Sequence, residues 1–162
     1  MSDFYTEQLV KRQPTAGTTA ARAGLIGLTV VAAVGAFLIP ILIILLVIAI
    51  VLDFFLLPRL SIEYEYLYVN GDLDVDIIIN KQKRKKKFSM NINDMEMLAS
   101  AGAAETRNFQ VDKTYDFSSG ATQNKKYEMI VTSSGQRIKV IFEPNQTILE
   151  GIRMMAPRKV IL

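Results

Sequence analysis

Hydrophobic and polar positions divide the chain into two parts with different periodicity. From Ala23 to Leu52 no residue is charged, and the apolar run continues past Asp53 to Leu57. From Ile62 onward, polar and apolar residues alternate. A long uncharged run is typical of a membrane-spanning helix, whereas alternation is typical of a half-buried β-strand. The pattern therefore predicts an apolar helical segment followed by a β domain.

A single straight helix fits the uncharged run poorly. At about 1.5 Å per residue the run would be about 45 Å long, against a bilayer core of about 30 Å. Pro40 lies near its middle, and proline breaks a helix interior but suits a first turn. We therefore expect a transmembrane helical hairpin over residues 15–58, with one helix ending at Leu38, a turn near 38–40 and a second helix beginning at Pro40. A single kinked span is the alternative, and a cleaved signal peptide fits less well because the apolar stretch is too long.

The first helix of the predicted hairpin is rich in small residues, which let a neighbouring backbone approach closely. They suit packing on the second helix or on a second protomer, and the candidate packing face consists of Ala20, Gly24, Gly27 and Gly35.

Charges predict the orientation of the hairpin. Lys11, Arg12 and Arg22 precede the apolar run, basic residues follow it, and the apex around Phe37–Ile41 has no charge. Positive residues remain on the cytoplasmic side of a membrane. We therefore expect a multi-pass protein of the cell membrane with both termini in the cytoplasm and residues 1–14 as an N-terminal tail.

Residues 59–162 predict a cytoplasmic antiparallel β domain. Asn70-Gly71 is a strong turn signal between the alternating segments 62–69 and 72–79, and a turn at Lys81–Arg84 leads into a third strand that ends near Ile92. A second hairpin is predicted around Ser134-Gly135, where it groups Tyr127, Met129, Val131, Ile138, Val140 and Phe142. Residues 94–100 and 108–117 are weaker strand candidates, and apolar residues at helical spacing predict a capping helix over about 145–156. The expected fold class is thus a membrane-anchored α+β protein with a small, partly open barrel or bent sheet.

This order of elements resembles a bacterial pleckstrin-homology-like (PH-like) domain, in which a bent antiparallel sheet is capped by a C-terminal helix. The segments that carry the likeness are Leu57-Pro58-Arg59, Glu63-Tyr64-Glu65-Tyr66, Asn70-Gly71-Asp72-Leu73-Asp74 and Met155-Ala156-Pro157-Arg158-Lys159-Val160. Together they are similar to an uncharacterised family of small bacterial two-helix membrane proteins. The resemblance implies the fold and supplies no catalytic residues.

A run of cations is the first candidate for function. Six cations in seven residues stand at a predicted hairpin tip: Lys81, Lys83, Arg84, Lys85, Lys86 and Lys87. A basic cluster near a membrane anchor is attracted to anionic lipid, although a charge run is also the ordinary composition of a solvated turn.

Other polar and aromatic groups have simpler interpretations. Asp72, Asp74 and Asp76, with Glu63 and Glu65, present oxygens for a hard cation, but alternating acids are typical of the solvent face of a strand. Glu65 and Asp76 are expected to face each other, with Lys87 offsetting their repulsion. Tyr64, Tyr66 and Tyr68 fit a core better than a ligand platform, and Asp53 is expected at the membrane interface close to Arg59.

Composition excludes several classes of active site. Among 162 residues there is no Cys and no His, which excludes disulfides, zinc fingers, catalytic Ser-His-Asp triads and imidazole metal ligands. The net charge of +3 is too small to indicate a nucleic-acid binder, and no small-molecule substrate or cofactor is indicated. We expect a non-enzymatic, membrane-anchored binding or scaffold protein that acts on a protein partner, anionic lipid or its own copies. The alternative is an accessory subunit of a larger membrane complex, such as a transporter or an envelope-stress assembly.

Overall fold

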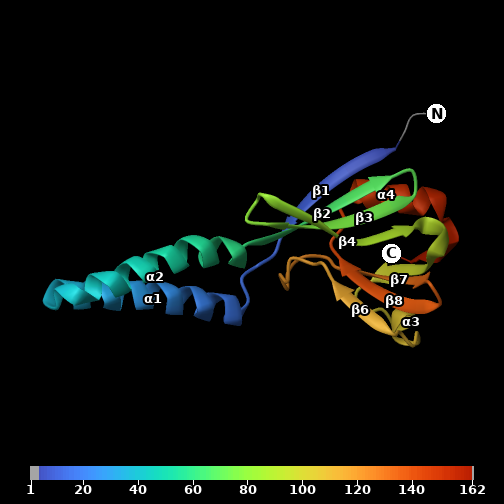
Figure 1. Ribbon diagram of the computed structural model, residues 1–162. Helices are drawn as coiled ribbons and strands as arrows, with labels where there is room; N and C mark the ends of the chain where they lie inside the picture. Colours follow the sequence, from blue (N-terminus) through green and yellow to red (C-terminus); the bar gives the residue numbers. More distant parts are fainter. Residues whose placement is uncertain (1–3, 162) are drawn as a thin grey trace. The chain divides into compact units, whose positions relative to one another are not determined.

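A computed structural model describes residues 4–161 of the chain, which form two compact units (Figure 1). The helical unit consists of Gln13–Ile62 and Ile79–Lys83, and the described part of the β unit consists of residues 4–12, Glu63–Ile78 and residues 84–161.

The helical unit contains two apolar helices, as the sequence predicts. Helix α1 spans Ala16–Leu38 and begins behind Thr15, whose side chain accepts a hydrogen bond from the Thr18 amide. The chain leaves the helical conformation at Ile39, and Pro40 opens a 3-10 turn, Pro40–Leu42, which leads into α2, Ile43–Leu56. A further 3-10 turn, Leu57–Leu60, ends the unit's apolar segment. Proline at the first turn costs no hydrogen bond, so the break lies where the sequence places it.

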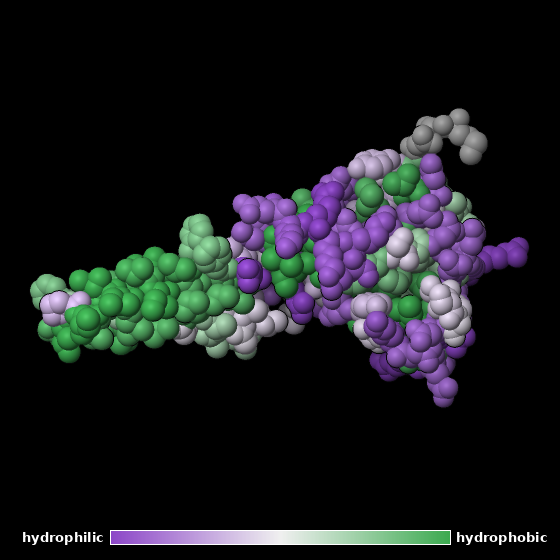
Figure 2. Space-filling view, viewed as in Figure 1, coloured by the Kyte–Doolittle hydropathy of each residue, from purple (hydrophilic) through white to green (hydrophobic). Residues whose placement is uncertain are grey.

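The two helices contact each other through small side chains. Ala32 on α1 and Ala49 on α2 are each only 2% exposed, whereas Phe37 is 90% exposed. Figure 2 shows the resulting continuous apolar surface along the helical pair. Ala16–Leu38 and Pro40–Leu60 are each long and apolar enough to cross a membrane.

The first sheet of the β unit has the strand order β1-β2-β3-β4. Its strands are β1 Tyr5–Lys11, β2 Ile62–Val69, β3 Asp72–Ile79 and β4 Lys83–Asn91. Asn70 and Gly71 have φ values of 47° and 98°, so they form the predicted two-residue turn. The second turn is shorter than predicted, because β4 already begins at Lys83.

Strand β1 corrects the expectation of a tail at the N-terminus. It pairs antiparallel with β2 over its whole length, from Tyr5 opposite Val69 to Lys11 opposite Glu63. Its apolar residues lie on both faces, with Leu9 exposed and Val10 buried. A pattern without one apolar face does not predict a strand.

The second sheet has the order β6-β8-β7-β5-β9. Its strands are β5 Met95–Ser100, β6 Lys113–Asp116, β7 Tyr127–Ser133, β8 Gln136–Phe142 and β9 Val160–Ile161, and a short helix α3, Ala104–Arg107, precedes β6. The β7–β8 register pairs Tyr127 with Phe142 and Met129 with Val140, which confirms the predicted hairpin. However, β6 pairs parallel with β8, and β9 pairs parallel with β5. The two sheets do not close into a barrel.

The C-terminal helix α4, Gln146–Met155, packs on the β unit's first sheet and confirms the predicted cap. It buries Ile148, Leu149 and Ile152. Gly151 allows the close approach, because a Cβ at this position would lie 2.6 Å from ring atoms of both Phe4 and Tyr68.

Candidate functional site

The basic segment, Lys81–Lys87, occupies the β3–β4 turn and the first half of β4. Asn80 and Lys81 both have φ of 54°, which makes the tight turn. All six cations in the segment are exposed. The structure therefore brings the six predicted residues together along one short stretch of chain.

Nearby carboxylates divide the six cations into two classes. Arg84 donates to the Glu65 carboxylate and Lys86 donates to the Asp74 carboxylate, each at 2.6 Å. The remaining four, Lys81, Lys83, Lys85 and Lys87, form no ion pair with any residue between 4 and 161. The attraction of this segment for an external anion therefore resides mainly in these four unpaired lysines.

The two carboxylates that accept these ion pairs lie in different environments. Glu65 is 3% exposed, and burial, reinforced by a hydrogen bond with Glu7, raises the pKa of its carboxyl despite the opposing charge of Arg84. Burial would also raise the pKa of Asp74, but hydrogen bonds from Lys86 and Ser89 outweigh it and the net shift is downward. Arg84, not the predicted Lys87, is thus the cation that compensates Glu65.

Two of the three alternating acids on β3 are engaged by neighbouring side chains, whereas Asp76 Oδ1 is buried without a hydrogen bond. Asp74 accepts from Lys86 and Ser89, and Asp72 accepts from the Asn91 side-chain amide at 2.6 Å. Within residues 4–161 no group of three or more His, Cys, Asp or Glu side chains is arranged to hold a metal ion. The arrangement is that of a cross-strand polar network.

The three tyrosines of β2 belong to the core. Tyr64, Tyr66 and Tyr68 are at most 2% exposed. The Tyr66 hydroxyl donates to the Phe117 carbonyl at 2.6 Å, and burial raises the pKa of Tyr68 to about 12. Their prediction as core residues is confirmed.

Asp53 has a polar partner that the sequence analysis did not foresee. The Thr29 hydroxyl on α1 donates to Asp53 Oδ2 on α2 at 2.6 Å, while Oδ1 is buried without a hydrogen bond. The carboxylate therefore links the two helices.

The predicted small-residue face divides between two environments. A Cβ at Gly35 would lie 3.0 Å from Leu42, so Gly35 accommodates the turn between the helices. Gly24 and Gly27 have nothing within 4 Å of a Cβ position, and Ala20 is exposed. The small residues that are buried in the helical pair are Ala32 and Ala49, which lie outside the predicted face.

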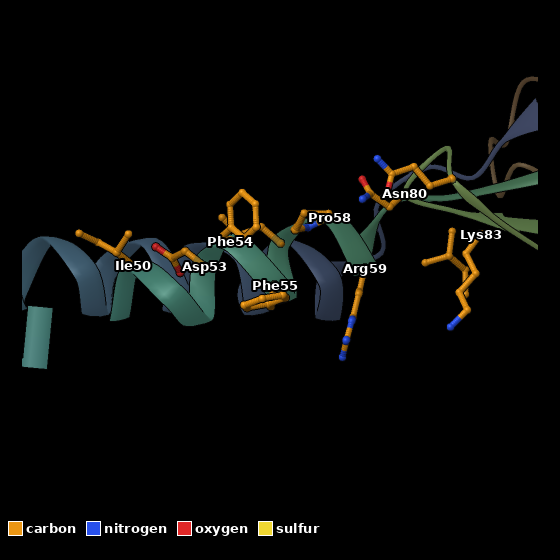
Figure 3. A pocket seen from close by; sticks show the side chains of 11 residues that line it. Ile50, Asp53, Phe54, Phe55, Pro58, Arg59, Asn80 and Lys83 are labelled. Atoms are coloured by element: carbon orange, nitrogen blue, oxygen red, sulfur yellow. The ribbon is translucent and has the colours of Figure 1, made fainter. Parts of the chain in front are cut away.

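A hollow of about 1130 Å³ lies within the helical unit, between the end of α2 and the β3–β4 turn (Figure 3). Phe54 and Phe55 form an apolar wall, and Arg59 and Lys83 also line the hollow. The turn is fastened by a hydrogen bond from the Asn80 amide to the Ser61 carbonyl, 3.1 Å. The hollow therefore combines an apolar wall with two cations.

A buried polar network around Glu143 was not predicted. The Glu143 carboxylate, in a residue 7% exposed, accepts from the Ser119 amide, the Ser119 hydroxyl and the Asn124 side chain at 2.8–3.1 Å. The Gln8 side chain donates to the Glu143 carbonyl and accepts from the Asn145 amide. These bonds connect β1, the loop after β6 and the start of α4, so the network has a structural role in the β unit.

Residues 2–162 match a family model described as Bacterial PH-like domain (DUF6106). No curated protein and no solved structure matches this chain. Since the match covers nearly the whole sequence, the chain belongs to this bacterial PH-like family, as the resemblance noted in the sequence implies. PH-like domains are generally non-catalytic.

Proposed function

We propose that this bacterial PH-like protein is a non-enzymatic, membrane-anchored binding or scaffold protein. In this proposal α1 and α2 cross the bilayer as a hairpin, both chain ends lie in the cytoplasm, and the β unit offers a binding surface to a protein partner or to further copies of the chain. The unpaired lysines Lys81, Lys83, Lys85 and Lys87 contact anionic lipid.

The pairing of β1 with β2 is the observation that carries the topology. The two strands directly flank the helical pair in sequence, and Lys11 lies opposite Glu63. Strands that share main-chain hydrogen bonds must lie in the same compartment. An even number of crossings between them is compatible with this pairing, whereas a single crossing is not.

The surface and charge of the helical unit support insertion. Apolar side chains such as Val31 and Phe54 are 69% and 75% exposed, and such a surface is costly in water and suits lipid. Lys11 and Arg59 flank the helices, while the turn at Ile39 carries no charge. The positive-inside rule then favours the cytoplasm for both ends.

Cysteine labelling of the full chain tests this topology, because the sequence has no native Cys. Single variants Ser2→Cys, Lys125→Cys and Phe37→Cys are expressed in bacteria and exposed to a membrane-impermeant maleimide. We expect Cys at positions 2 and 125 to react only after the inner membrane is permeabilised, and Cys at position 37 to react in intact spheroplasts. Labelling of positions 2 and 125 from opposite sides would overturn the hairpin.

A second candidate function rests on the open face of α1. Gly24 and Gly27 leave room for a close backbone approach that α2 does not use. This favours an accessory subunit that docks on a polytopic membrane protein of a transporter or stress assembly. Stoichiometric co-purification of such a protein in mild detergent, lost in Gly24→Leu, would support the subunit role over the stand-alone scaffold.

A further inference from the structure

We infer that the hollow beside α2 binds one molecule of anionic phospholipid, with its phosphate at Arg59 and Lys83 and an acyl chain along Phe54 and Phe55. This inference rests on the proposed membrane insertion and adds a discrete lipid site to it. The general attraction of the basic segment for anionic lipid requires no such site.

The hollow changes from apolar to cationic along α2. Ile50, Phe54 and Phe55 supply apolar lining, and Arg59, further along the same helical segment, and Lys83 supply two cations. From Ile50 to Arg59 a helical rise is about 14 Å, which is the scale of a phosphate, a glycerol and the upper part of an acyl chain. Figure 3 shows Phe55, Arg59 and Lys83 extending to the same side of the α2 ribbon.

The two cations have no internal anion to satisfy them. Neither Arg59 nor Lys83 forms an ion pair within the described residues. Asp53, the acidic residue of the hollow, accepts from Thr29 through Oδ2 and forms no ion pair with either cation. An external phosphate is therefore the complementary group, and Arg59 matches two phosphate oxygens at once.

The apolar wall identifies the ligand as a lipid in preference to a soluble phosphate. Phe54 and Phe55 are 75% and 55% exposed, and a soluble phosphate would leave them uncovered. A zwitterionic headgroup would add its own cation beside Arg59 and Lys83. Both features favour an anionic lipid such as phosphatidylglycerol.

The β3–β4 turn supplies the shape of the site. The Asn80 amide is held by the Ser61 carbonyl, and the positive φ of Asn80 and Lys81 fixes the turn. This places Lys83 in the lining together with Arg59, although the two are far apart in sequence.

Native mass spectrometry of the full chain in detergent tests the site, with phosphatidylglycerol and phosphatidylcholine of identical acyl chains as probes. We expect one retained phosphatidylglycerol per chain and a weaker adduct with phosphatidylcholine. The double variant Arg59→Gln/Lys83→Gln should lower phosphatidylglycerol retention about tenfold or more, since each cation near a membrane surface contributes substantially. The matched control Lys125→Gln/Lys126→Gln removes equal charge outside both the hollow and the basic segment and should retain the lipid.

Three results would overturn the inference: equal retention in Arg59→Gln/Lys83→Gln and the unchanged chain, equal loss in the control, or displacement of the lipid by glycerol 3-phosphate. Lys83→Gln alone, on an exposed turn, provides the same comparison if circular dichroism shows that the double variant is misfolded.

Membrane fractionation separates the two proposals. A chain that fractionates with membranes but retains no lipid contradicts the lipid site alone, whereas a chain found in the soluble fraction contradicts membrane anchoring.

Discussion

The helical unit and the β unit treat apolar side chains in opposite ways. In the β unit, Tyr66, Leu73 and Phe142 are 0% exposed. In the helical unit, Ala32 and Ala49 are the buried apolar residues among those described, and large side chains point outward. Folding of the chain alone removes the apolar surface of the β unit from water. The helical unit leaves its large apolar side chains exposed, which supports the membrane insertion proposed above.

The comparison also shows how each unit satisfies its polar groups. The β unit surrounds the Glu143 carboxylate with three donors, and the Glu65 carboxylate accepts from Arg84. The helical unit leaves Asp53 with a single described donor, Thr29. Buried polar groups require partners, and each unit has one carboxylate oxygen that is buried without a hydrogen bond among the described residues, Asp76 Oδ1 in the β unit and Asp53 Oδ1 in the helical unit.

Truncating one aromatic residue in each unit gives the sharpest test of this contrast. Tyr66→Ala should destabilise the β unit by about 3–5 kcal/mol, the usual cost of removing a buried aromatic side chain. Phe37→Ala, at the exposed turn of the helical unit, should leave the unfolding midpoint of the β unit unchanged. Urea unfolding of the full chain in detergent, followed by tyrosine fluorescence, measures both. Equal effects would remove the distinction between the units.

Replacing one helical glycine by alanine in each unit sharpens the same comparison. Gly151→Ala forces a Cβ to within 2.6 Å of the Phe4 and Tyr68 rings, and overpacking of this kind costs about 1–3 kcal/mol. Gly24→Ala meets no atom within 4 Å, and alanine favours a helix by up to about 1 kcal/mol. The midpoint temperature of thermal unfolding in detergent should therefore fall for Gly151→Ala and stay unchanged or rise for Gly24→Ala.

The pH dependence of stability should come from the β unit. Burial would raise the pKa of Glu128, but hydrogen bonds from Thr106, Lys139 and Gly102 outweigh it and lower the pKa below the usual 4.5. A carboxyl with a lowered pKa stabilises the fold above its usual pKa and loses that contribution as the pH falls through the folded value. Glu128→Gln should destabilise the protein by about 1 kcal/mol at pH 7 and flatten the decline of stability below pH 4.5. If the stability of the variant declines below pH 4.5 as steeply as that of the unchanged chain, other carboxyls cause the pH dependence.

The smallest expected effect concerns the basic segment, where the chain passes between the units. A fluorophore at Gln82→Cys in nanodiscs should be quenched by headgroup-labelled lipid more strongly in phosphatidylglycerol than in phosphatidylcholine, and less at high salt. Lys85→Gln/Lys87→Gln should reduce that quenching several-fold. Arg84→Gln/Lys86→Gln removes cations that Glu65 and Asp74 already neutralise, so it should reduce quenching less. The reverse order would contradict the division of the segment into paired and unpaired cations.

Local signals predicted the parts of the fold that depend on local conformation. Asn70-Gly71 and Ser134-Gly135 adopt the positive φ values that their turns require, and Pro40 stands where the first apolar helix has ended. The amphipathic spacing of Ile148, Leu149 and Ile152 predicted α4 and its buried face.

Pairings between distant segments were beyond the reach of the sequence. Strand β1 meets a partner more than fifty residues away and shows no single apolar face. Strands β6 and β8 pair in parallel, so no tight turn joins them and no turn signal in the sequence reveals the pairing. For the same reason a run of Lys and Arg does not reveal which of its members meet Glu65 and Asp74. The partners of Glu143 likewise come from two segments far apart in the sequence, β1 and the loop after β6.

The pairing of β1 with β2 also dictates an order of events during synthesis. The ribosome releases β1 first, but Val69, the partner of Tyr5, emerges only after the entire apolar insert. Until then the nascent β1 has an unsatisfied edge, which is a hazard for aggregation. Once α1 and α2 pack together, they bring the ends of the insert near each other and shorten the effective loop that the two strands must close. In the proposed topology, assembly of the helices therefore precedes the pairing of β1 with β2, and a chain whose helices fail to insert would leave its first strand without a partner.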